Sequence, residues 1–290
     1  MATAATKTAL VVGGTNGIGK GIAQRLAALG VKVVLVGRDK DKTAAVAADV
    51  GASEWLLVDV CKQADVRRLA DEVRSKYTHL DYLVVSAGAL NDERKLSQDG
   101  VEWLLALNYL WRFQLIGLLK DLLAAAPEGA RVLAVATSGS NSDVFFDDPN
   151  FEHSSWTMLK AARQAHQLHD VFTVEAQRRW GALGNGIQFH VTYPGWVRSK
   201  EASDITVGGL AGFILKNPIS MYLRKSIEVT ALQHVPLLLE PVGAHGGKLW
   251  NAVQSGGPVK EIVPASRVVD PEYGAKCWQL SESLVKPEYK

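Results

Sequence analysis

The chain has 290 residues, 47% of them hydrophobic and 21% charged, which is enough for one large α/β domain with a well-filled core. The formal net charge is +2, and acidic and basic residues are interleaved, so the basic stripe that nucleic-acid binding requires is not expected. Cys61 and Cys277 are far apart and lack metal-ligand spacing, which predicts free thiols, a reducing compartment and no metal site.

The N-terminal residues 1–7, MATAATK, contain no apolar segment of the length that a signal peptide needs. No uninterrupted apolar run reaches the length of a membrane span. We therefore expect a cytoplasmic protein without a stable membrane span, built as a single domain over residues 1–290.

Residues 8–30 read as an apolar strand, a tight glycine turn and an amphipathic helix. Gly13, Gly17 and Gly19 occupy the turn, where the missing Cβ lets the backbone reverse and lets a pyrophosphate approach the amides that open the helix. A second strand follows and ends in a charged residue about twenty positions further on. This arrangement predicts a dinucleotide-binding fold.

Strand and helix patterns alternate along the rest of the chain, which favours a parallel sheet with helices on both faces. The helix expected at residues 101–126 is mostly apolar, so it should be buried in the core or in a subunit interface. Asp270 and Pro271 are expected to cap and open the last helix. Further strands are expected at 31–37, 54–60, 80–88, 130–138, 186–195 and 246–253, and further helices at 39–50, 62–76 and about 154–180.

The segment 196–241 contains an apolar, glycine-interrupted stretch, GGLAGFILKNPISMYL. This composition suits a mobile lid over a substrate, while a peripheral membrane contact or simple core filling are the alternatives.

Several ordered motifs together resemble the short-chain dehydrogenases/reductases. They are the glycine turn, Ser-Ala-Gly at 86–88, Asn108, a Thr-Ser pair closing the fifth strand, a lysine in the following helix and Pro-Gly at 194–195. The match covers about residues 7–200 in unbroken order, and the Asp-Asp-Pro at 147–149 is similar to an insert of a divergent fungal branch. The resemblance implies a doubly wound Rossmann fold with a seven-stranded parallel sheet and a nicotinamide cofactor.

The second strand ends in Gly37 and Arg38, where a carboxylate would bind the ribose hydroxyls of NAD. Arg38 therefore favours the 2′-phosphate of NADP(H). The resemblance implies that the cofactor is bound by Gly13, Thr15, Asn16, Gly17, Ile18, Gly19, Arg38, Asp59, Val60, Ser86, Ala87, Gly88, Asn108, Lys160, Pro194, Gly195 and Val197.

In the family a serine polarises the substrate carbonyl, a tyrosine transfers the proton, a lysine lowers the pKa of that tyrosine, and an asparagine supports a proton relay. Thr137, with Ser138 beside it, Lys160 and Asn108 match three of these positions, but Trp156 stands at the tyrosine position. The separation from Thr137 to Lys160 is also longer than usual by about one and a half helical turns.

An indole N–H does not ionise in the accessible range, so Trp156 cannot be the acid. The replacement candidates are Tyr193 and His153, each with a structural role as the alternative, whereas His166 and His169 are expected to be structural. A reductase of small metabolites from secondary metabolism could also do without an acid if its acceptor is an iminium ion or a conjugated alkene, with Trp156 as an aromatic wall beside the cation.

Two other classes of function stay open at this stage. One is a nonredox cyclase or isomerase on the same fold, and the other is a catalytically silent NADPH-binding protein. The resemblance also implies a homodimer or homotetramer that associates through the helices at 101–126 and 154–180.

Overall fold

The computed structural model describes residues 6–195, 226–243, 246–252 and 257–290. Within these residues one sheet of eight strands has the order β3-β2-β1-β4-β5-β6-β7-β8. Seven strands are parallel, as expected, and β8 adds an antiparallel edge that the sequence did not predict. The strands are β1 Thr8–Val12, β2 Lys32–Gly37, β3 Glu54–Leu57, β4 Tyr82–Val85, β5 Ala130–Val135, β6 Ile187–Tyr193, β7 Lys248–Asn251 and β8 Lys260–Ile262.

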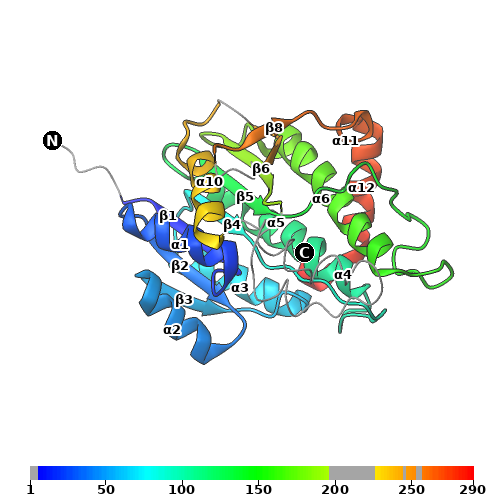
Figure 1. The fold of residues 1–290 in the computed structure, drawn as a ribbon, viewed down its shortest axis with the longest axis horizontal. Helices are drawn as coiled ribbons and strands as arrows, with labels where there is room; N and C mark the ends of the chain where they lie inside the picture. The colour runs from blue at the N-terminus through cyan, green and yellow to red at the C-terminus, as the bar shows by residue number, and fades with distance from the viewer. Residues whose placement is uncertain (1–5, 196–225, 244–245, 253–256) are drawn as a thin grey trace.

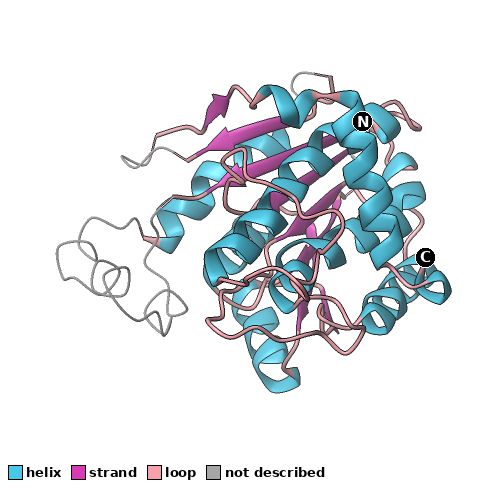
Figure 2. Cartoon of the chain, turned by 90° about the vertical axis from the view of Figure 1, so that its right-hand side faces the viewer, coloured by secondary structure: helices cyan, strands magenta, loops and turns pink. Residues whose placement is uncertain are grey.

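Helices cover both faces of this sheet (Figures 1 and 2). One apolar cluster joins α1, α2 and α10 to one face, and a larger cluster joins α3, α5, α6 and α12 to the other. The α/β fold and its two helical layers confirm the prediction from the alternating pattern. The helices are α1 Gly17–Ala28, α2 Lys40–Val50, α3 Gln63–Lys76, α4 Trp103–Leu105, α5 Trp111–Ala124, α6 Met158–Trp180, α10 Ile227–Leu239, α11 Ser266–Val269 and α12 Pro271–Leu284, with a 3-10 turn η2 at Pro287–Tyr289.

The inner strands are apolar on both faces because both faces are covered. Residues 8–12 of β1 and 82–85 of β4 are buried throughout, as continuous apolar runs of a parallel sheet should be. The central strands are therefore fixed from both sides, and their carboxyl ends form a rigid edge.

The single helix expected at 101–126 is interrupted. Glu102 caps the short α4 by accepting a hydrogen bond from the Leu105 amide at 2.8 Å, and a π-helical segment η1, Ala106–Leu110, separates α4 from α5. A π-helical turn inside an α-helix occurs frequently at functional sites, and this one contains Asn108.

Most of the segment for which a lid was expected, residues 196–225, lies outside the described residues. Its C-terminal part forms α10, which lies beside α1 (Figure 1). Ala231, Val235 and Leu238 of α10 are buried in the cluster that covers the β1–β2 face of the sheet. Residues 227–239 therefore belong to the core.

The C-terminal helix begins as the sequence predicts. The Asp270 carboxylate accepts hydrogen bonds from the amides of Glu272 and Tyr273 at 2.8 and 2.9 Å, and Pro271 occupies the first turn. Trp278 of α12 packs against Phe113 of α5 and against Phe172 and Trp180 of α6, with ring centroids 4.9–5.9 Å apart.

Candidate functional site

Two glycines of the turn after β1, Gly13 and Gly19, have no space for a side chain. Gly13 has φ +82°, and a Cβ there would overlap the backbone nitrogen of Ala87 in the loop after β4. A Cβ on Gly19 would overlap the Gly13 carbonyl. The N-terminus of α1 therefore packs directly against the turn, where its amides and dipole favour a phosphate group.

Three other residues predicted to bind the nucleotide lie in the same turn. Asn16 precedes α1 in an extended conformation, and Gly17, with φ +55°, opens the helix. Ile18 packs partly against the core beneath. The structure thus places the predicted turn residues together at the carboxyl edge of β1.

Gly37 at the end of β2 has no space for a side chain. A Cβ there would overlap the side chains of Thr15 and Thr43, so a carboxylate at this position would require rearrangement of both. Arg38 follows it and is exposed. The tip of β2 therefore presents a guanidinium group, which suits a phosphate better than two ribose hydroxyls.

The loop after β3 lies beside Arg38. Burial raises the pKa of Cys61 to about 11, with Asp59 adding to the rise and Arg38 opposing it. The Asp59 carboxylate accepts a hydrogen bond from the Cys61 amide at 3.1 Å. Val60 packs partly against the core.

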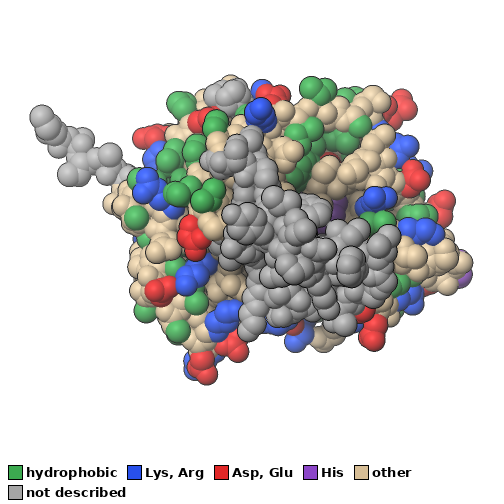
Figure 3. Space-filling model, viewed as in Figure 1, with side chains coloured by type: hydrophobic (Ala, Val, Ile, Leu, Met, Phe, Trp, Pro, Cys, Tyr) green, Lys and Arg blue, Asp and Glu red, His purple; other side chains and the backbone are tan. Residues whose placement is uncertain are grey.

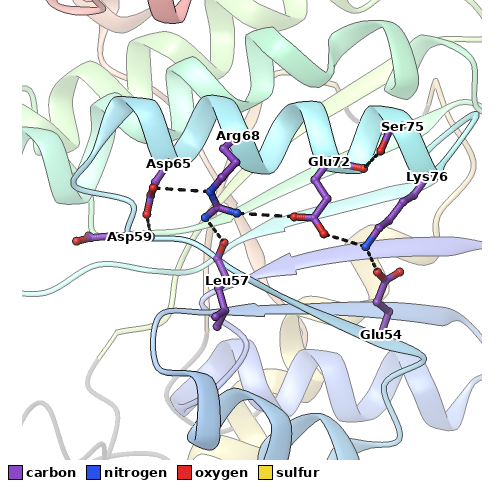
Figure 4. Close-up of polar contacts among 8 residues, drawn as sticks. All are labelled: Glu54, Leu57, Asp59, Asp65, Arg68, Glu72, Ser75 and Lys76. Carbon is purple, nitrogen blue, oxygen red and sulfur yellow. Dashed lines mark hydrogen bonds and ion pairs between the residues drawn. The ribbon is translucent and has the colours of Figure 1, made fainter.

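Polar contacts from α3 hold this loop in place (Figure 4). The Asp65 carboxylate accepts a hydrogen bond from the Asp59 amide at 3.2 Å, and Arg68 donates to the Leu57 carbonyl at 2.9 Å. The loop that contains Asp59 and Val60, which are predicted to contact adenine, is thus held in place by α3.

Asn108 holds the loop that follows β4. Its amide oxygen accepts from the Ala89 amide at 3.1 Å, and its nitrogen donates to the carbonyls of Ala89 and Leu104 at 2.9 and 3.1 Å. Arg112, one turn later, donates to the Ala87 carbonyl at 2.8 Å. These contacts fix residues 86–89, in which Ser86 and Ala87 are half-buried and Gly88 is exposed.

Ser138 and Tyr193 meet at the carboxyl ends of β5 and β6. The Tyr193 hydroxyl donates to the Asp170 carboxylate of α6 at 2.6 Å, and the nearby Ser138 hydroxyl acts to lower the pKa of Tyr193. The other Asp170 oxygen accepts from the Gly139 amide at 2.9 Å. Ser138 is half-buried and Thr137 is exposed, so this group reaches from the interior to the surface of the site.

The buried members of this group have strongly shifted acidities. Burial raises the pKa of Asp170 to about 7, against the opposing effect of its two hydrogen bonds. Burial, together with the neighbouring Asp170, raises the pKa of Tyr193 well above its ordinary value. Asp170 therefore keeps its proton to a higher pH than an exposed aspartic acid does.

Trp156 precedes α6 and contacts Glu102, which caps α4. Its indole N–H donates to a buried carboxylate oxygen of Glu102 at 3.2 Å, and its ring packs in a small cluster with Phe151 and Ala162. Burial raises the pKa of Glu102.

Lys160 lies at the start of α6 and donates to the hydroxyl and carbonyl oxygens of Ser155 at 2.8 and 3.2 Å. A Cβ on Gly139 would overlap the backbone of Gln167, so the chain after β5 touches α6 seven residues beyond Lys160, which is about 10 Å along the helix. The roles predicted for Trp156 and Lys160 remain predictions, and the hydrogen bonds that their side chains donate go to Glu102 and Ser155.

The other predicted residues are placed as follows. His153 is exposed, and its backbone amide donates to Asp148 at 3.2 Å. Pro194 and Gly195 follow Tyr193 at the end of β6, and Gly195 has φ +70°. Val197 lies outside the described residues.

Sequence reasoning missed Asp170 and Arg112. Two nitrogens of the buried Arg112 guanidinium have no hydrogen-bond partner within the described part of the chain, and burial lowers its pKa to about 9. Burial and Arg112 lower the pKa of His166 to about 4 and lower that of His169 as well. The sequence signal for Asp170 was its charge inside a helical stretch, LHDVF, whose other positions are apolar or aromatic.

The described residues include no group of three His, Cys, Asp or Glu side chains that could bind a metal ion. Their helices are also too short or too polar to cross a membrane. On the face shown in Figure 3, described Lys and Arg side chains alternate with Asp and Glu side chains and form no single basic patch.

Comparison with known proteins places this site in a family. A family model described as short chain dehydrogenase matches residues 7–146. The short-chain dehydrogenase/reductase prx1 of Penicillium roqueforti is 31% identical over 292 residues, covering 96% of this chain and 85% of that protein. The chain belongs to the short-chain dehydrogenase/reductase family.

Other members of the short-chain dehydrogenase/reductase family are similar over most of the chain. Human retinol dehydrogenase 13 is 27% identical over 293 residues, covering 98% of this chain and 86% of its own. The fold is also that of an actinorhodin polyketide ketoreductase variant solved with NADPH. That structure has 22% identity, a TM-score of 0.66 and coverage of 89% of this chain and 99% of its own. This short-chain dehydrogenase/reductase is therefore an oxidoreductase of the Rossmann class.

Proposed function

We propose that the protein is an NADP(H)-dependent reductase that acts on a carbonyl or related acceptor of a small metabolite in secondary-metabolite biosynthesis. The observation that carries this proposal is the tip of β2, where Gly37 has no space for a carboxylate and Arg38 is exposed beside the Asp59–Cys61 loop. The polyketide ketoreductase of the same fold was solved with NADPH, which supports the same choice of cofactor.

The residues of this chain have separate roles in the proposed reaction. The glycine turn would bind the pyrophosphate, and Arg38 would bind the 2′-phosphate of the adenosine. Residues 86–88, fixed by Asn108, would lie beside the rest of the cofactor. When bound, the cofactor supplies the hydride. Ser138 would orient the acceptor, since its hydroxyl is half-exposed at the end of β5.

The first prediction concerns cofactor preference. The unmodified protein should bind NADPH at least about tenfold more tightly than NADH, and Arg38→Ala should weaken NADPH binding by about tenfold while NADH binding stays unchanged. Fluorescence titration with both nucleotides measures these affinities. Arg74→Ala, which removes an exposed arginine at the end of α3, is the control and should change neither affinity.

Equal affinities, or a preference for NADH, would contradict the assignment of Arg38. Single-turnover reactions with ketone, enone and iminium compounds then define the acceptor by stoichiometric oxidation of NADPH. Product formation without nucleotide would instead support a nonredox cyclase or isomerase, and nucleotide binding with no turnover would support a silent NADPH-binding protein.

A further inference from the structure

Three neighbouring side chains from three elements lead from the interior to the site. Asp170 of α6 is 2% exposed, Tyr193 of β6 is 6% exposed, and Ser138 after β5 is half-buried. The Tyr193 hydroxyl is 2.6 Å from the Asp170 carboxylate, and the Ser138 hydroxyl lies close enough to lower the pKa of Tyr193. Hydroxyl groups both donate and accept, so a proton can pass along such a chain.

We propose that Asp170 is the proton donor of the reduction and that it acts through Tyr193 and Ser138. Ser138 is the catalytic residue in contact with the acceptor, and Asp170 and Tyr193 are positioning residues behind it. The inference rests on the proposed reductase function, and it assigns the proton transfer that Trp156 cannot perform.

The two protonation states of Asp170 give Ser138 two orientations. With the carboxylate ionised, Tyr193 donates to Asp170, as the structure has it, and in the proposed relay Ser138 donates to Tyr193, so the serine hydrogen points into the protein. With Asp170 protonated, each donor reverses: Asp170 donates to Tyr193, Tyr193 donates to Ser138, and the serine hydrogen is free to point at the acceptor. The Gly139 amide bonds the second Asp170 oxygen and is compatible with both states.

The reaction balances for a carbonyl acceptor. A bound nicotinamide cofactor would supply the hydride, with its two electrons, to the carbonyl carbon. As the carbonyl oxygen gains negative charge, it takes the proton of Ser138, Ser138 takes that of Tyr193, and Tyr193 takes that of Asp170, which ends as a carboxylate. After the product leaves, the same chain run in reverse lets water at Ser138 return a proton to Asp170.

The groups around this part of α6 are compatible with the proposal. Tyr193 of β6 and the Gly139 amide after β5 are the groups that act on Asp170 in addition to burial. His166 and His169 lie on the same helix, where burial and Arg112 of α5 lower the pKa of both imidazoles, so they are neutral near pH 7. The ring of Tyr109 from η1 contacts His169 edge-on, at 6.3 Å between centroids.

The test combines a readout of protonation with a readout of turnover. In infrared spectra of the protein with NADPH, a band of a protonated carboxyl should disappear as the pH rises through about 7. The band should be absent in Asp170→Asn, whose amide can keep both hydrogen bonds. The catalytic probe is 9,10-phenanthrenequinone, an activated dicarbonyl, with NADPH oxidation as the signal.

Reduction by the unmodified protein should be constant below about pH 7 and fall about tenfold per pH unit above it, because the protonated form of Asp170 is needed. Asp170→Asn should lower kcat by about 10²-fold and abolish the fall, since a positioned acid contributes about 10²–10⁴ in rate. Tyr193→Phe and Ser138→Ala should lower kcat to a similar extent, whereas Ser138→Thr keeps the hydroxyl and should restore most of it.

Thr173→Val is the matched control. Thr173 is buried on the same helix and donates to the His169 carbonyl at 3.0 Å, so its loss perturbs α6 without touching the relay, and kcat and the pH profile should stay unchanged. If Asp170→Asn keeps the kcat and pH profile of the unmodified protein, or if no band titrates, the relay is wrong while the reductase stands. If the unmodified protein binds NADPH but does not reduce the quinone, both proposals are overturned.

Discussion

Asn108 shows at the scale of one residue how the loop after β4 is held in place. Its side chain makes three hydrogen bonds, two of them to Ala89 in the loop after β4. Asn108 is 6% exposed, so these partners could not be replaced freely by water. The position of residues 86–88 at the edge of the sheet thus depends on one buried amide.

We expect Asn108→Ala to cost about 2 kcal/mol of the free energy of unfolding, because backbone groups of Ala89 and Leu104 lose their partners. It should also weaken NADPH binding by about tenfold, since the loop after β4 loosens. Urea unfolding and fluorescence titration measure the two effects.

Gln114→Ala is the matched control for this variant. Gln114 is a buried amide on α5 that donates to the carbonyls of Gln63 and Tyr289, both at 3.0 Å, and it has no contact with residues 86–89. Its loss should lower stability to a similar extent and leave NADPH affinity intact. Unchanged NADPH affinity in Asn108→Ala would show that Asn108 does not position the loop.

At the scale of elements, the start of α6 decides which residues can reach the site. Thr157 caps α6, so Trp156 precedes the helix and Lys160 lies in its first turn. The chain after β5 meets α6 at Gln167 and Asp170, two turns further along. The chain after β5 therefore contacts α6 about two turns beyond Lys160, while the catalytic roles of Trp156 and Lys160 stay predictions.

Trp156→Tyr should consequently give no gain in ketone reduction. A tyrosine before α6 would point toward Glu102, as the indole does, and it can still donate a hydrogen bond to that carboxylate. We expect the variant to keep its fold and its affinity for NADPH, measured by thermal unfolding and by titration. A measurable gain in reduction would instead place residue 156 in the active site.

Trp156→Phe is the companion variant. It leaves one oxygen of the buried Glu102 carboxylate without its indole partner, so it should lower the free energy of unfolding by about 1–3 kcal/mol more than Trp156→Tyr does. Equal stabilities of the two variants would show that the contact with Glu102 contributes nothing.

At the scale of the whole molecule, the C-terminal helix occupies a surface on which a subunit contact was expected. The family resemblance predicts association through residues 101–126 and 154–180. In the structure α12 lies against α6 (Figure 1), and Tyr109 of η1 is bonded to Ser281 at 2.6 Å. Trp278 is 7% exposed between aromatic rings of α5 and α6. The chain thus buries against itself part of the area that the predicted dimer would use.

We therefore expect a monomer at micromolar concentration, measured by size-exclusion chromatography with light scattering. Trp278→Ala should lower the free energy of unfolding by about 3–5 kcal/mol and promote self-association, because the rings of Phe113, Phe172 and Trp180 become accessible. Glu282→Ala removes only the carboxylate that is bonded to the Trp278 indole at 2.9 Å. The free energy of unfolding and the degree of self-association should change little in this variant. A stable dimer of the unmodified chain would show that association uses another surface or the outer side of α12.

The sequence by itself determined the parts whose signal is local. The glycine turn, the apolar strands, the capped last helix and the Gly37-Arg38 tip can be read from neighbouring residues, since periodicity and backbone freedom act over a few positions. The antiparallel β8 and the π-helical break at Asn108 were not readable, because pairing and packing across the chain decide them.

Only the tertiary structure decided which side chains meet at the end of β5 and β6. Ser138, Asp170 and Tyr193 come from three elements that are far apart along the chain, and the spacing of neighbouring residues carries no signal of their contact. Strand register and the contact of Gly139 with α6 bring these three groups together and leave Trp156 with Glu102. Hydrogen bonding acts over about 3 Å in space regardless of the distance along the chain, so the chemistry of this site depends on packing as well as on motif.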